Sequence, residues 1–572
     1  MITRVLSENQ RIQDIIPWHY GEEPSVVAVA APSVQKILAL RALNDGPSIG
    51  QYSHSVKKEI SLDKKDGTLY EFGNYSVWKI SISSIDAKSM NFHFSQLNLP
   101  NRSQMYIYNG ENNVILGPVA SENVSNNKFA SDIVFGDKVT IEIVFYDDDY
   151  DRFEIEIAQL FYGFNNSTAS YGLAQGCIPD IVCPEGNGWQ VEAASVCLIL
   201  NSSGEVCSGS LVTDDCYTGT PYILSASHCL ENQDVSNWVF RFRYRNVDCG
   251  GTEVPFEFSW KSFSGSTLIS SWEDSDFALV ELSEEVEAED EVVFAGWIRL
   301  DNIPTEITTI HHPRGDAMKI SRDANSPTVN TTPINFTGST TNFTVATGNA
   351  YEMVHDNGNG GDFGILEPGS SGAPLFDQNN RIVGIVSGGV ADVCTNPNNS
   401  FGGRFFSSWV GGGTNSTELQ NWLGGTLNST TTNSNGIPFI SGEEVVCDSP
   451  DTYTLENAPP GYSVSWTVTP ASLFSGSSGG SGSSVNLEAA NSFVSGSATL
   501  TFSMTNGACG SRTVTRNLWV GKPSIPSISA PNCFEPGVNY TISVNSQGGE
   551  SYSWNLPNCP FLPFDPERCW EN

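Results

Sequence analysis

The stretch Glu367-Pro-Gly-Ser-Ser-Gly-Ala-Pro374 determines how this chain is interpreted. It holds Ser371 in a Gly-x-Ser-Gly turn, in which the backbone N–H groups of Gly369 and Ser371 can converge on one oxygen atom. Gly369 permits the geometry that points its N–H inward, and Gly372 leaves room beyond the serine. A serine hydroxyl is a poor nucleophile unless an imidazole accepts its proton and a carboxylate holds that imidazole. The turn therefore predicts a histidine and an acid elsewhere in the chain.

Two upstream stretches supply both groups. Ser225-Ala-Ser-His-Cys229 offers His228 as a general base, and Ser275-Asp-Phe-Ala-Leu-Val-Glu281 offers Asp276 at the start of an apolar run. The chain order His, Asp, Ser recurs in serine peptidase triads. Each residue alone has a plainer interpretation, as a turn serine, a structural histidine or a strand-ending aspartate. Together they favour a triad of His228, Asp276 and Ser371, with Gly369 and Ser371 as the oxyanion hole.

Composition limits the possible partners. The 572 residues exceed the size of one hydrophobic core, so about three or four domains are expected. Lys plus Arg minus Asp plus Glu is 28 − 64 = −36, which disfavours nucleic acid and anionic membranes as partners. No run of about 18 apolar residues exists, so no membrane-spanning helix is expected. The low charged fraction of 16% suits a protein of strands and turns.

Cysteine usage predicts an oxidising compartment. There are 13 Cys, and eight of them lie between residues 177 and 394. No Cys-x-x-Cys pair is present, so disulfides are favoured over zinc, and no metal or other cofactor is expected. The first residues, Met1-Ile-Thr-Arg-Val-Leu-Ser-Glu8, show no apolar signal segment. We nevertheless expect a secreted, extracellular protein whose signal is missing from this sequence.

An all-β organisation in four parts is predicted. Residues 1–168 alternate polar and apolar residues in strand-like runs and are predicted to form a β-sandwich, preceded by a short helix near 33–42. Residues 169–438 hold the candidate triad. Residues 439–522 are predicted to be an Ig-like module clamped by Cys447–Cys509. Similar stretches recur with a period of roughly 86 residues (533 − 447), so residues 523–572 are predicted to be an incomplete second module.

Residues 177 to about 425 resemble the bacterial lysyl endopeptidase family of chymotrypsin-fold serine proteases. The matching stretches include Cys177-Ile-Pro-Asp-Ile-Val-Cys-Pro-Glu-Gly-Asn-Gly188, the segments around Cys207, His228, Asp276 and Pro368–Leu375, Phe294-Ala-Gly-Trp297, Ile310-His-His-Pro313, Phe405-Phe-Ser-Ser-Trp409 and the Trp422 helix. The resemblance implies a double β-barrel, a precursor with an N-terminal propeptide, and the triad named above. It also implies disulfides Cys177–Cys394, Cys183–Cys249 and Cys207–Cys229. Cys197 and Cys216 remain and are expected to form a fourth bridge.

The sequence departs from the family at the specificity pocket. Asn399 stands where the family has its specificity aspartate, and Ser387 stands where it has a histidine. Trypsin-like enzymes carry an aspartate six residues before the nucleophile, and here that residue is Ile365. Because a buried lysine ammonium needs a carboxylate, strict Lys specificity is not expected. Maturation is expected between residues 165 and 177, after a residue other than lysine.

The predicted function is secreted serine endopeptidase activity on protein or peptide substrates through an acyl-enzyme. The C-terminal modules are expected to contact a cell surface or matrix. The alternative is a catalytically inactive, protease-like adhesin or binding protein. Glutamyl-type specificity on the same fold is a second alternative.

Overall fold

The computed structural model divides the chain into two compact units, residues 1–437 and 438–572. It describes residues 1–544 apart from 7–10, 17, 45–47, 50–51, 110–113, 147–148, 165–173, 252–258, 338–341, 356–360, 391–393, 395–398, 448, 522–527 and 530–542. The predicted boundary at 168/169 and most of the predicted second module therefore lie outside the described residues. The four-part division stays a prediction.

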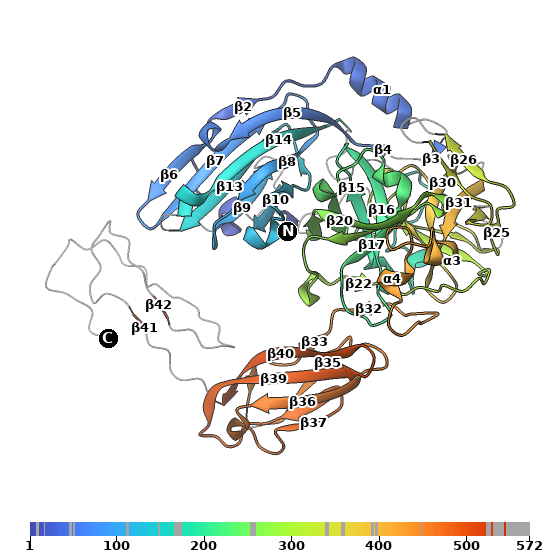
Figure 1. The fold of residues 1–572 in the computed structure, drawn as a ribbon. Coiled ribbons are helices and arrows are strands. Elements are labelled where there is room, and N and C mark those ends of the chain that lie inside the picture. Colours follow the sequence, from blue (N-terminus) through green and yellow to red (C-terminus); the bar gives the residue numbers. More distant parts are fainter. Residues whose placement is uncertain are drawn as a thin grey trace. The chain divides into compact units, whose positions relative to one another are not determined.

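The fold is all-β, as predicted, and begins with a β-sandwich (Figure 1). Its first sheet runs β2 (Val26–Ala28), β7 (Tyr75–Ser83), β13 (Lys138–Tyr146), β9 (Gln104–Asn109), β10 (Val114–Val119) and β1 (Ile2–Val5), with β6 (Thr68–Phe72) beside β7. Its second sheet runs β11 (Phe129–Ala130), β8 (Ser89–Asn98), β14 (Glu154–Gly163) and β5 (Ser55–Asp63), with β12 (Val134–Phe135) beside β8.

Alternate residues of β13 face two different apolar clusters. Ile141 and Ile143 point into the core between the two sheets, whereas Val144 packs against Leu6 and Ile16 on the outer face. This follows from the period of two along a strand. The first residues of the chain therefore cover a sheet face that would otherwise be exposed.

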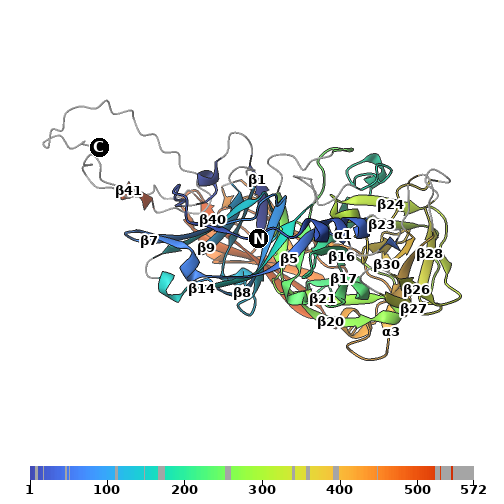
Figure 2. The same cartoon turned by 90° about the horizontal axis from the view of Figure 1, so that it is seen from above.

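The double β-barrel follows. The first barrel runs β19 (Ser259–Ser264), β18 (Val239–Phe242), β15 (Val196–Leu200), β16 (Glu205–Leu211), β17 (Tyr222–Ala226), β21 (Phe277–Leu282) and β20 (Ser266–Trp272). The second runs β24 (Lys319–Asp323), β23 (Ile307–His311), β29 (Pro374–Phe376), β30 (Ile382–Val390), β31 (Asn399–Arg404), β28 (Ala350–Val354) and β25 (Thr328–Val329). Figure 2 shows β23, β24, β28 and β30 of the second barrel grouped together.

The N-terminal sandwich is joined to the barrels edge to edge. Strand β1 pairs antiparallel with both β10 of the sandwich and β19 of the first barrel, so one sheet runs through both. Helix α1 (Val34–Asn44) leads from the sandwich to two short strands, β3 (Ser48–Ile49) and β4 (Tyr52–Ser53). The helix predicted near 33–42 is thus present.

Three of the predicted disulfides are present, and two are not. The chain forms Cys177–Cys394, Cys183–Cys249 and Cys207–Cys229. The predicted Cys197–Cys216 bridge is wrong, because Cys197 is a free, fully buried thiol. In β15 it lies opposite Gly209 and packs in the apolar core of the barrel, whereas Cys216 lies in the turn after β16, where its N–H donates to Asp214.

The second unit contains a smaller β-sandwich. One sheet runs β33 (Phe439–Ser441), β35 (Asp451–Glu456) and β38 (Ser484–Leu487); the other runs β34 (Val445–Val446), β40 (Gly510–Gly521), β39 (Ser495–Asn506), β36 (Ser463–Thr469) and β37 (Gly479–Ser481). Apolar residues alternate along β39, so Leu500, Phe502 and Met504 fill its core. The predicted Cys447–Cys509 clamp is wrong, because Cys447 is a free, exposed thiol. The apolar core joins the sheets, and the Arg516 guanidinium of β40 donates to Ile440 O at 2.6 Å and to Gly442 O at 2.7 Å.

Candidate active site

His228 and Asp276 are held together by several hydrogen bonds. His228 lies in a short 3-10 helix, Ser227–Leu230, directly after β17, and Asp276 directly precedes β21. The imidazole Nδ1 lies 2.9 Å from Asp276 Oδ2. The Asp276 carboxylate also accepts from the Ser227 hydroxyl and from the His228 backbone N–H, both at 3.0 Å. Donation from Nδ1 puts the proton on that nitrogen and leaves the lone pair on Nε2, as a general base requires.

Asp276 reaches this position through an unusual backbone conformation. Its φ is +56° in the left-handed region, which aspartate tolerates better than most residues. The residue is fully buried, and its backbone C=O accepts from Ser227 N at 2.8 Å. A carboxylate with this many donors is fixed in orientation, so it can in turn fix the histidine ring.

The Ser371 turn is bonded to both barrels. Ser208 of β16 donates its N–H to Ser371 O at 2.8 Å, and its hydroxyl donates to Gly369 O at 2.9 Å. On the other side, Gly372 N donates to Val386 O of β30 at 2.8 Å. A Cβ added at Gly372 would lie 2.8 Å from Ala226 N, two residues before His228. These contacts bring the serine turn against the histidine segment.

Gly369 is required by its conformation and its surroundings. Its φ is +95°, and a Cβ there would lie 3.0 Å from both Arg314 N and His312 O. Neither the Gly369 amide nor the Ser371 amide donates a hydrogen bond to another part of the described chain. Two free backbone donors beside a serine hydroxyl are suited to stabilise an oxyanion.

The candidate nucleophile and the candidate base are both buried. Ser371 is 0% exposed and His228 is 4% exposed. The Ser371 hydroxyl makes no hydrogen bond with any residue that the structure describes. A buried hydroxyl without a partner inside the described chain is unusual and marks a functional group or a site shaped for another molecule.

An aromatic stack over the histidine was not predicted from the sequence. The hairpin of β26 (Ile334–Thr337) and β27 (Asn342–Val345) places the Phe343 ring parallel to the His228 imidazole, with centroids 4.5 Å apart. Phe336 stacks on Phe343 at 4.5 Å, and Phe401 meets Phe336 edge-on. The alternation in Ile334–Thr337 could have indicated a hairpin, but no sequence signal places it over His228.

The three predicted pocket residues have different surroundings. The Asn399 amide donates to the Glu352 carboxylate of β28, because β28 and β31 are paired with Asn399 opposite Val354. The buried Ser387 hydroxyl accepts from Gly403 N at 3.1 Å. Ile365 is fully buried, and its C=O accepts from the Ser321 hydroxyl. Sequence reasoning missed Glu352, a carboxylate brought beside Asn399 by strand pairing alone.

Other acids near the turn are less available. Glu367 is buried and bonded to Arg314 Nε at 2.7 Å and to Gln175 N at 3.0 Å. Asp392 lies outside the described residues. Glu352 is therefore the described carboxylate that lies against Asn399.

Buried histidines beneath the turn have structural roles. His311 Nδ1 lies 2.7 Å from the Ser370 hydroxyl, and its Nε2 lies 3.0 Å from the Ser321 hydroxyl. Burial lowers the pKa of His312 to about 4 and that of His311 well below its usual value, so both rings are neutral at neutral pH. Within the described ranges, no cluster of three His, Cys, Asp or Glu side chains suits a metal ion.

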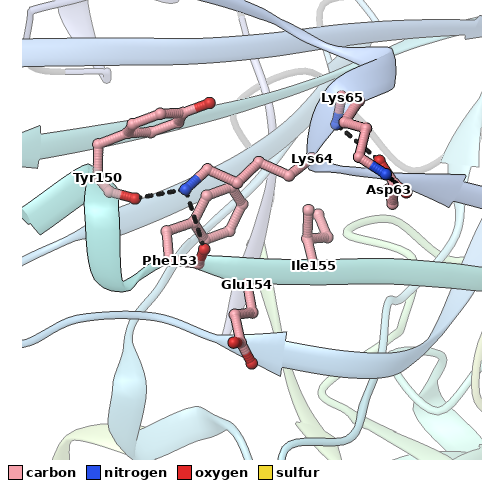
Figure 3. Close-up of a pocket in the computed structure, with 7 residues that line it drawn as sticks. All are labelled: Asp63, Lys64, Lys65, Tyr150, Phe153, Glu154 and Ile155. Atoms are coloured by element: carbon pink, nitrogen blue, oxygen red, sulfur yellow. Dashed lines mark hydrogen bonds and ion pairs between the residues drawn. The ribbon is translucent and has the colours of Figure 1, made fainter.

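A surface pocket of the N-terminal sandwich carries no comparable chemistry (Figure 3). The Lys64 ammonium donates to Tyr150 O at 2.7 Å and to Phe153 O at 3.3 Å, and it lies 3.8 Å from the Tyr150 ring centroid. These bonds join two short 3-10 helices. The lysine is therefore a structural tie.

A family model of the lysyl endopeptidase C-terminal domain matches residues 171–404. This part of the chain belongs to the lysyl endopeptidase family. The match includes all three residues of the predicted triad, and it assigns residues 171–404 to the serine proteases in general.

Several solved serine proteases are also similar to parts of this chain. Serine protease AL20 from an extremophilic microorganism is 16% identical over 37% of this chain and 92% of its own, with a TM-score of 0.26. A Glu endopeptidase is 15% identical over 41% and 93%, with a TM-score of 0.25. The secreted protease VesC from Vibrio cholerae is 12% identical over 59% and 70%, also with a TM-score of 0.25. TM-scores this low carry no weight for the function of this chain.

Proposed function

We propose that this chain is a serine endopeptidase that cleaves proteins or peptides through an acyl-enzyme. Ser371 Oγ attacks the scissile carbonyl carbon while His228 Nε2 takes its proton. The peptide C–N bond then breaks as His228 returns that proton to the leaving amine. Asp276 holds the imidazole and stabilises its cation. The amides of Gly369 and Ser371 hold the oxyanion. Water then repeats the sequence on the ester and releases the acid.

The observation that carries this proposal is the His228–Asp276 pair beside the Ser371 turn. Three donors fix the carboxylate, including the imidazole Nδ1 at 2.9 Å. The same strand β16 that bonds the serine turn is tied to the histidine helix by Cys207–Cys229. An inactive adhesin would not need this arrangement, which supports the enzyme over that alternative.

Replacing Ser371 with alanine tests the proposal. We expect Ser371→Ala to lower kcat by a factor on the order of 10⁶ with little change in stability, because removal of the nucleophile abolishes the acyl-enzyme. Ser370→Ala is the matched control, since its hydroxyl bonds His311 beneath the turn and takes no part in the reaction. Turnover of peptide substrate by Ser371→Ala within about tenfold of the parent would refute the assignment.

We propose that the enzyme does not select strictly for lysine at P1. Asn399 carries no charge to pair with a lysine ammonium, and Ile365 and Ser387 add none. The contact between Asn399 and Glu352 favours one rival, in which Glu352 supplies the missing carboxylate. Peptide-library profiling of the parent and of Glu352→Gln separates these cases. Broad selection at P1 by both the parent and Glu352→Gln supports the proposal. Selection of lysine by the parent that disappears in Glu352→Gln would instead identify Glu352 as the acid that binds the P1 lysine.

The surroundings of the enzyme are proposed to be extracellular. Three disulfides brace the barrels, and such bonds persist in oxidising compartments. No helix in the described ranges is long and apolar enough to cross a membrane. We further propose that residues 1–168 act as a propeptide and that residues 439–522 act as a surface-binding module. The proposed maturation site falls mostly in residues 165–173, outside the described residues.

A further inference from the structure

A carboxylate of the N-terminal sandwich is held by three side chains of the first barrel. The Arg241 guanidinium of β18 donates from Nε to Asp132 Oδ2 at 3.0 Å and from Nη2 to Asp132 Oδ1. Trp260 Nε1 and the Ser262 hydroxyl, both of β19, donate to the same Oδ2 at 2.9 Å and 2.6 Å. A forked guanidinium with two further donors is well suited to recognise a carboxylate. We call Arg241, Trp260 and Ser262 the carboxylate cradle.

The cradle is positioned by residues of the barrel itself. In the antiparallel pair of β18 and β19, Arg241 lies opposite Ser262. The Arg241 guanidinium carbon lies 4.7 Å from the centroid of the Trp260 ring and 4.8 Å from that of Tyr244, which follows β18. Aromatic faces attract a guanidinium and restrict its movement. The barrel therefore orients the donors, and the sandwich supplies the carboxylate.

The sheet edge beside the cradle is also covered by the sandwich. Strand β1 pairs antiparallel with β19, with Thr3 opposite Trp260 and Ile2 opposite Lys261. Strand β18 occupies the other side of β19. Loss of β1 would therefore turn β19 into an edge strand with unpaired N–H and C=O groups. Such an edge can bind another extended strand through its main chain.

An apolar face of the barrel surrounds the cradle. Six barrel residues belong to the apolar core of the sandwich rather than to the core of their own barrel: Leu198, Leu200, Val206, Val239, Tyr244 and Trp260. On the sandwich side, Ala130 and Ile133 lie near Asp132 in the sequence and pack in the same core. Trp, Tyr and Arg side chains enclosed by apolar neighbours are enriched at the centres of protein–protein interfaces. This face of the barrel therefore has the composition of a protein-binding surface.

We propose that the carboxylate cradle and the edge of β19 form a peptide-binding site outside the triad, which takes an extended segment with an aspartate or glutamate between apolar residues. The proposal rests on the release of residues 1–168, the propeptide proposed above. In the full-length chain, Asp132 fills the cradle and β1 fills the edge. After release, Arg241 loses its buried partner, and an uncompensated cation in an apolar surface is costly. An acid of another protein then takes the place of Asp132.

The first test removes the carboxylate in the full chain. Asp132→Gly in a Ser371→Ala background should lower the urea midpoint of residues 1–437, because Arg241 stays buried without its partner. Acetate has the atoms of the lost side chain, so sodium acetate should restore about half of the loss relative to sodium chloride at equal ionic strength. Equal midpoints in the two salts would show that the cradle does not recognise a carboxylate.

Two further variants control for folding and for general salt effects. Asp132→Gly/Arg241→Met lacks the guanidinium and should gain nothing from acetate. Asp132→Asn keeps the shape of the side chain without its charge, so it should lose stability and should not respond to acetate. An unchanged midpoint in Asp132→Asn would contradict recognition of the charge, even if Asp132→Gly does not fold.

The second test measures binding of a peptide. The folded Ser371→Ala chain is immobilised by a C-terminal tag, cut at a protease recognition sequence inserted before Cys177, and washed until the sandwich has left the surface. A peptide of residues 126–136 should then bind, and the same peptide with Asp132→Asn should bind at least about tenfold more weakly, because charge-assisted bonds are lost. The uncut chain should bind neither peptide, since Asp132 and β1 fill its site.

Each outcome of the second test decides the proposal. Equal binding of the two peptides, or binding of neither after the wash, would overturn it. Retention of the sandwich through the wash would also contradict it, because the site would stay closed. Neither test requires catalysis, so an active protease that fails them keeps its proposed function. A chain that passes both tests but hydrolyses no peptide in its Ser371 form would refute the protease function and not this site.

Discussion

At the scale of single residues, the backbone conformation of Gly369 orients an N–H group that is proposed to bind the oxyanion. Its φ of +95° and a Cβ position only 3.0 Å from Arg314 N exclude any side chain without movement of the turn. We expect Gly369→Ala to lower kcat/KM by about 100-fold, because movement of the turn displaces an oxyanion donor. Steady-state kinetics on a peptide ester measures this loss.

Gly188 provides a matched control for that substitution. It also has a positive φ, +87°, but a Cβ there meets nothing within 4 Å. Gly188→Ala should therefore carry the cost of the backbone conformation alone and leave kcat/KM within about twofold of the parent. Equal losses in both variants would show that general destabilisation, rather than the oxyanion turn, explains the effect.

The two free thiols among the described residues differ in reactivity for a physical reason. Burial raises the pKa of Cys197 above its usual value and removes the thiol from solvent, whereas Cys447 is exposed. We expect iodoacetamide to alkylate Cys447 and leave Cys197 unmodified in the native protein, with both modified after denaturation. Peptide mapping by mass spectrometry checks this outcome. Modification of native Cys197 would place it outside the barrel core.

Sequence could identify some of these residues but not others. His228 and Asp276 stood out because each lies in a local context, a cysteine-flanked turn and the start of an apolar strand, that its function explains. Cys197 was wrongly paired because an even number of cysteines says nothing about which strand face each occupies. Glu352 could not be found, since only the register of β28 against β31 brings it to Asn399.

At the scale of elements, the hairpin of β26 and β27 acts on the histidine through one ring. Phe343 covers one face of the His228 imidazole, with 7° between the ring planes. We expect Phe343→Ala to lower kcat/KM by about tenfold, because water gains access to the ring and the imidazole loses a packing partner. Phe343→Leu should retain more activity, since it keeps an apolar cover.

Phe336→Ala is the control at this scale. Phe336 belongs to the same hairpin and stacks on Phe343, one ring farther from His228. Phe336→Ala should perturb the hairpin as much as Phe343→Ala does, but it should reduce kcat/KM less. Equal reductions would show that the whole hairpin, rather than the Phe343 ring, supports the histidine.

The sequence anticipated the elements better than their contacts. Alternating residues predicted the strands of the N-terminal sandwich, because a half-buried strand leaves a period of two in the sequence. Near the end of the domain, Thr417-Glu-Leu-Gln420 has the pattern of a capping box, which predicts that Thr417 caps the last helix. Instead the Thr417 hydroxyl bonds Thr414, and the helix begins at Gln420 with no side-chain cap. A threonine hydroxyl can bond either a nearby loop residue or the first N–H groups of a helix, and the sequence does not show which of these bonds forms.

At the scale of the whole molecule, buried neutral histidines predict acid sensitivity. Burial lowers the pKa of His54 and His93 to about 3 and that of His312 and His355 to about 4, from 6.5. Each histidine therefore contributes stability that is fully present above pH 6.5. This stability is lost as the pH falls toward the pKa of that histidine in the folded protein. Each histidine that stays neutral in the folded protein contributes up to about 1.4 kcal/mol per pH unit to the slope of the free energy of unfolding against pH.

We expect the urea midpoint of unfolding for residues 1–437 to fall between pH 7 and pH 5 in a Ser371→Ala background. Carboxyl groups of ordinary pKa titrate below that interval. Burial raises the pKa of Glu192, Glu205, Asp316 and Asp323, and these groups oppose the trend, but we expect the buried histidines to outweigh them. His93→Gln is the control, because glutamine can still bond Gln159 but does not titrate. Its midpoint should depend less steeply on pH. A midpoint independent of pH from 7 to 5 would contradict the prediction.

The pairing of β1 with β19 bears on what happens if residues 1–168, proposed above as a propeptide, are cut from the protease barrels. Because one sheet runs through sandwich and barrel, a cut in the connecting chain does not by itself separate them. The cut changes an intramolecular contact into a complex of two pieces, and mass action then governs whether they stay together. A nicked molecule at high concentration would stay paired, whereas the same molecule diluted into a large volume would release the sandwich. Dilution, rather than cleavage alone, would then set when the two parts separate.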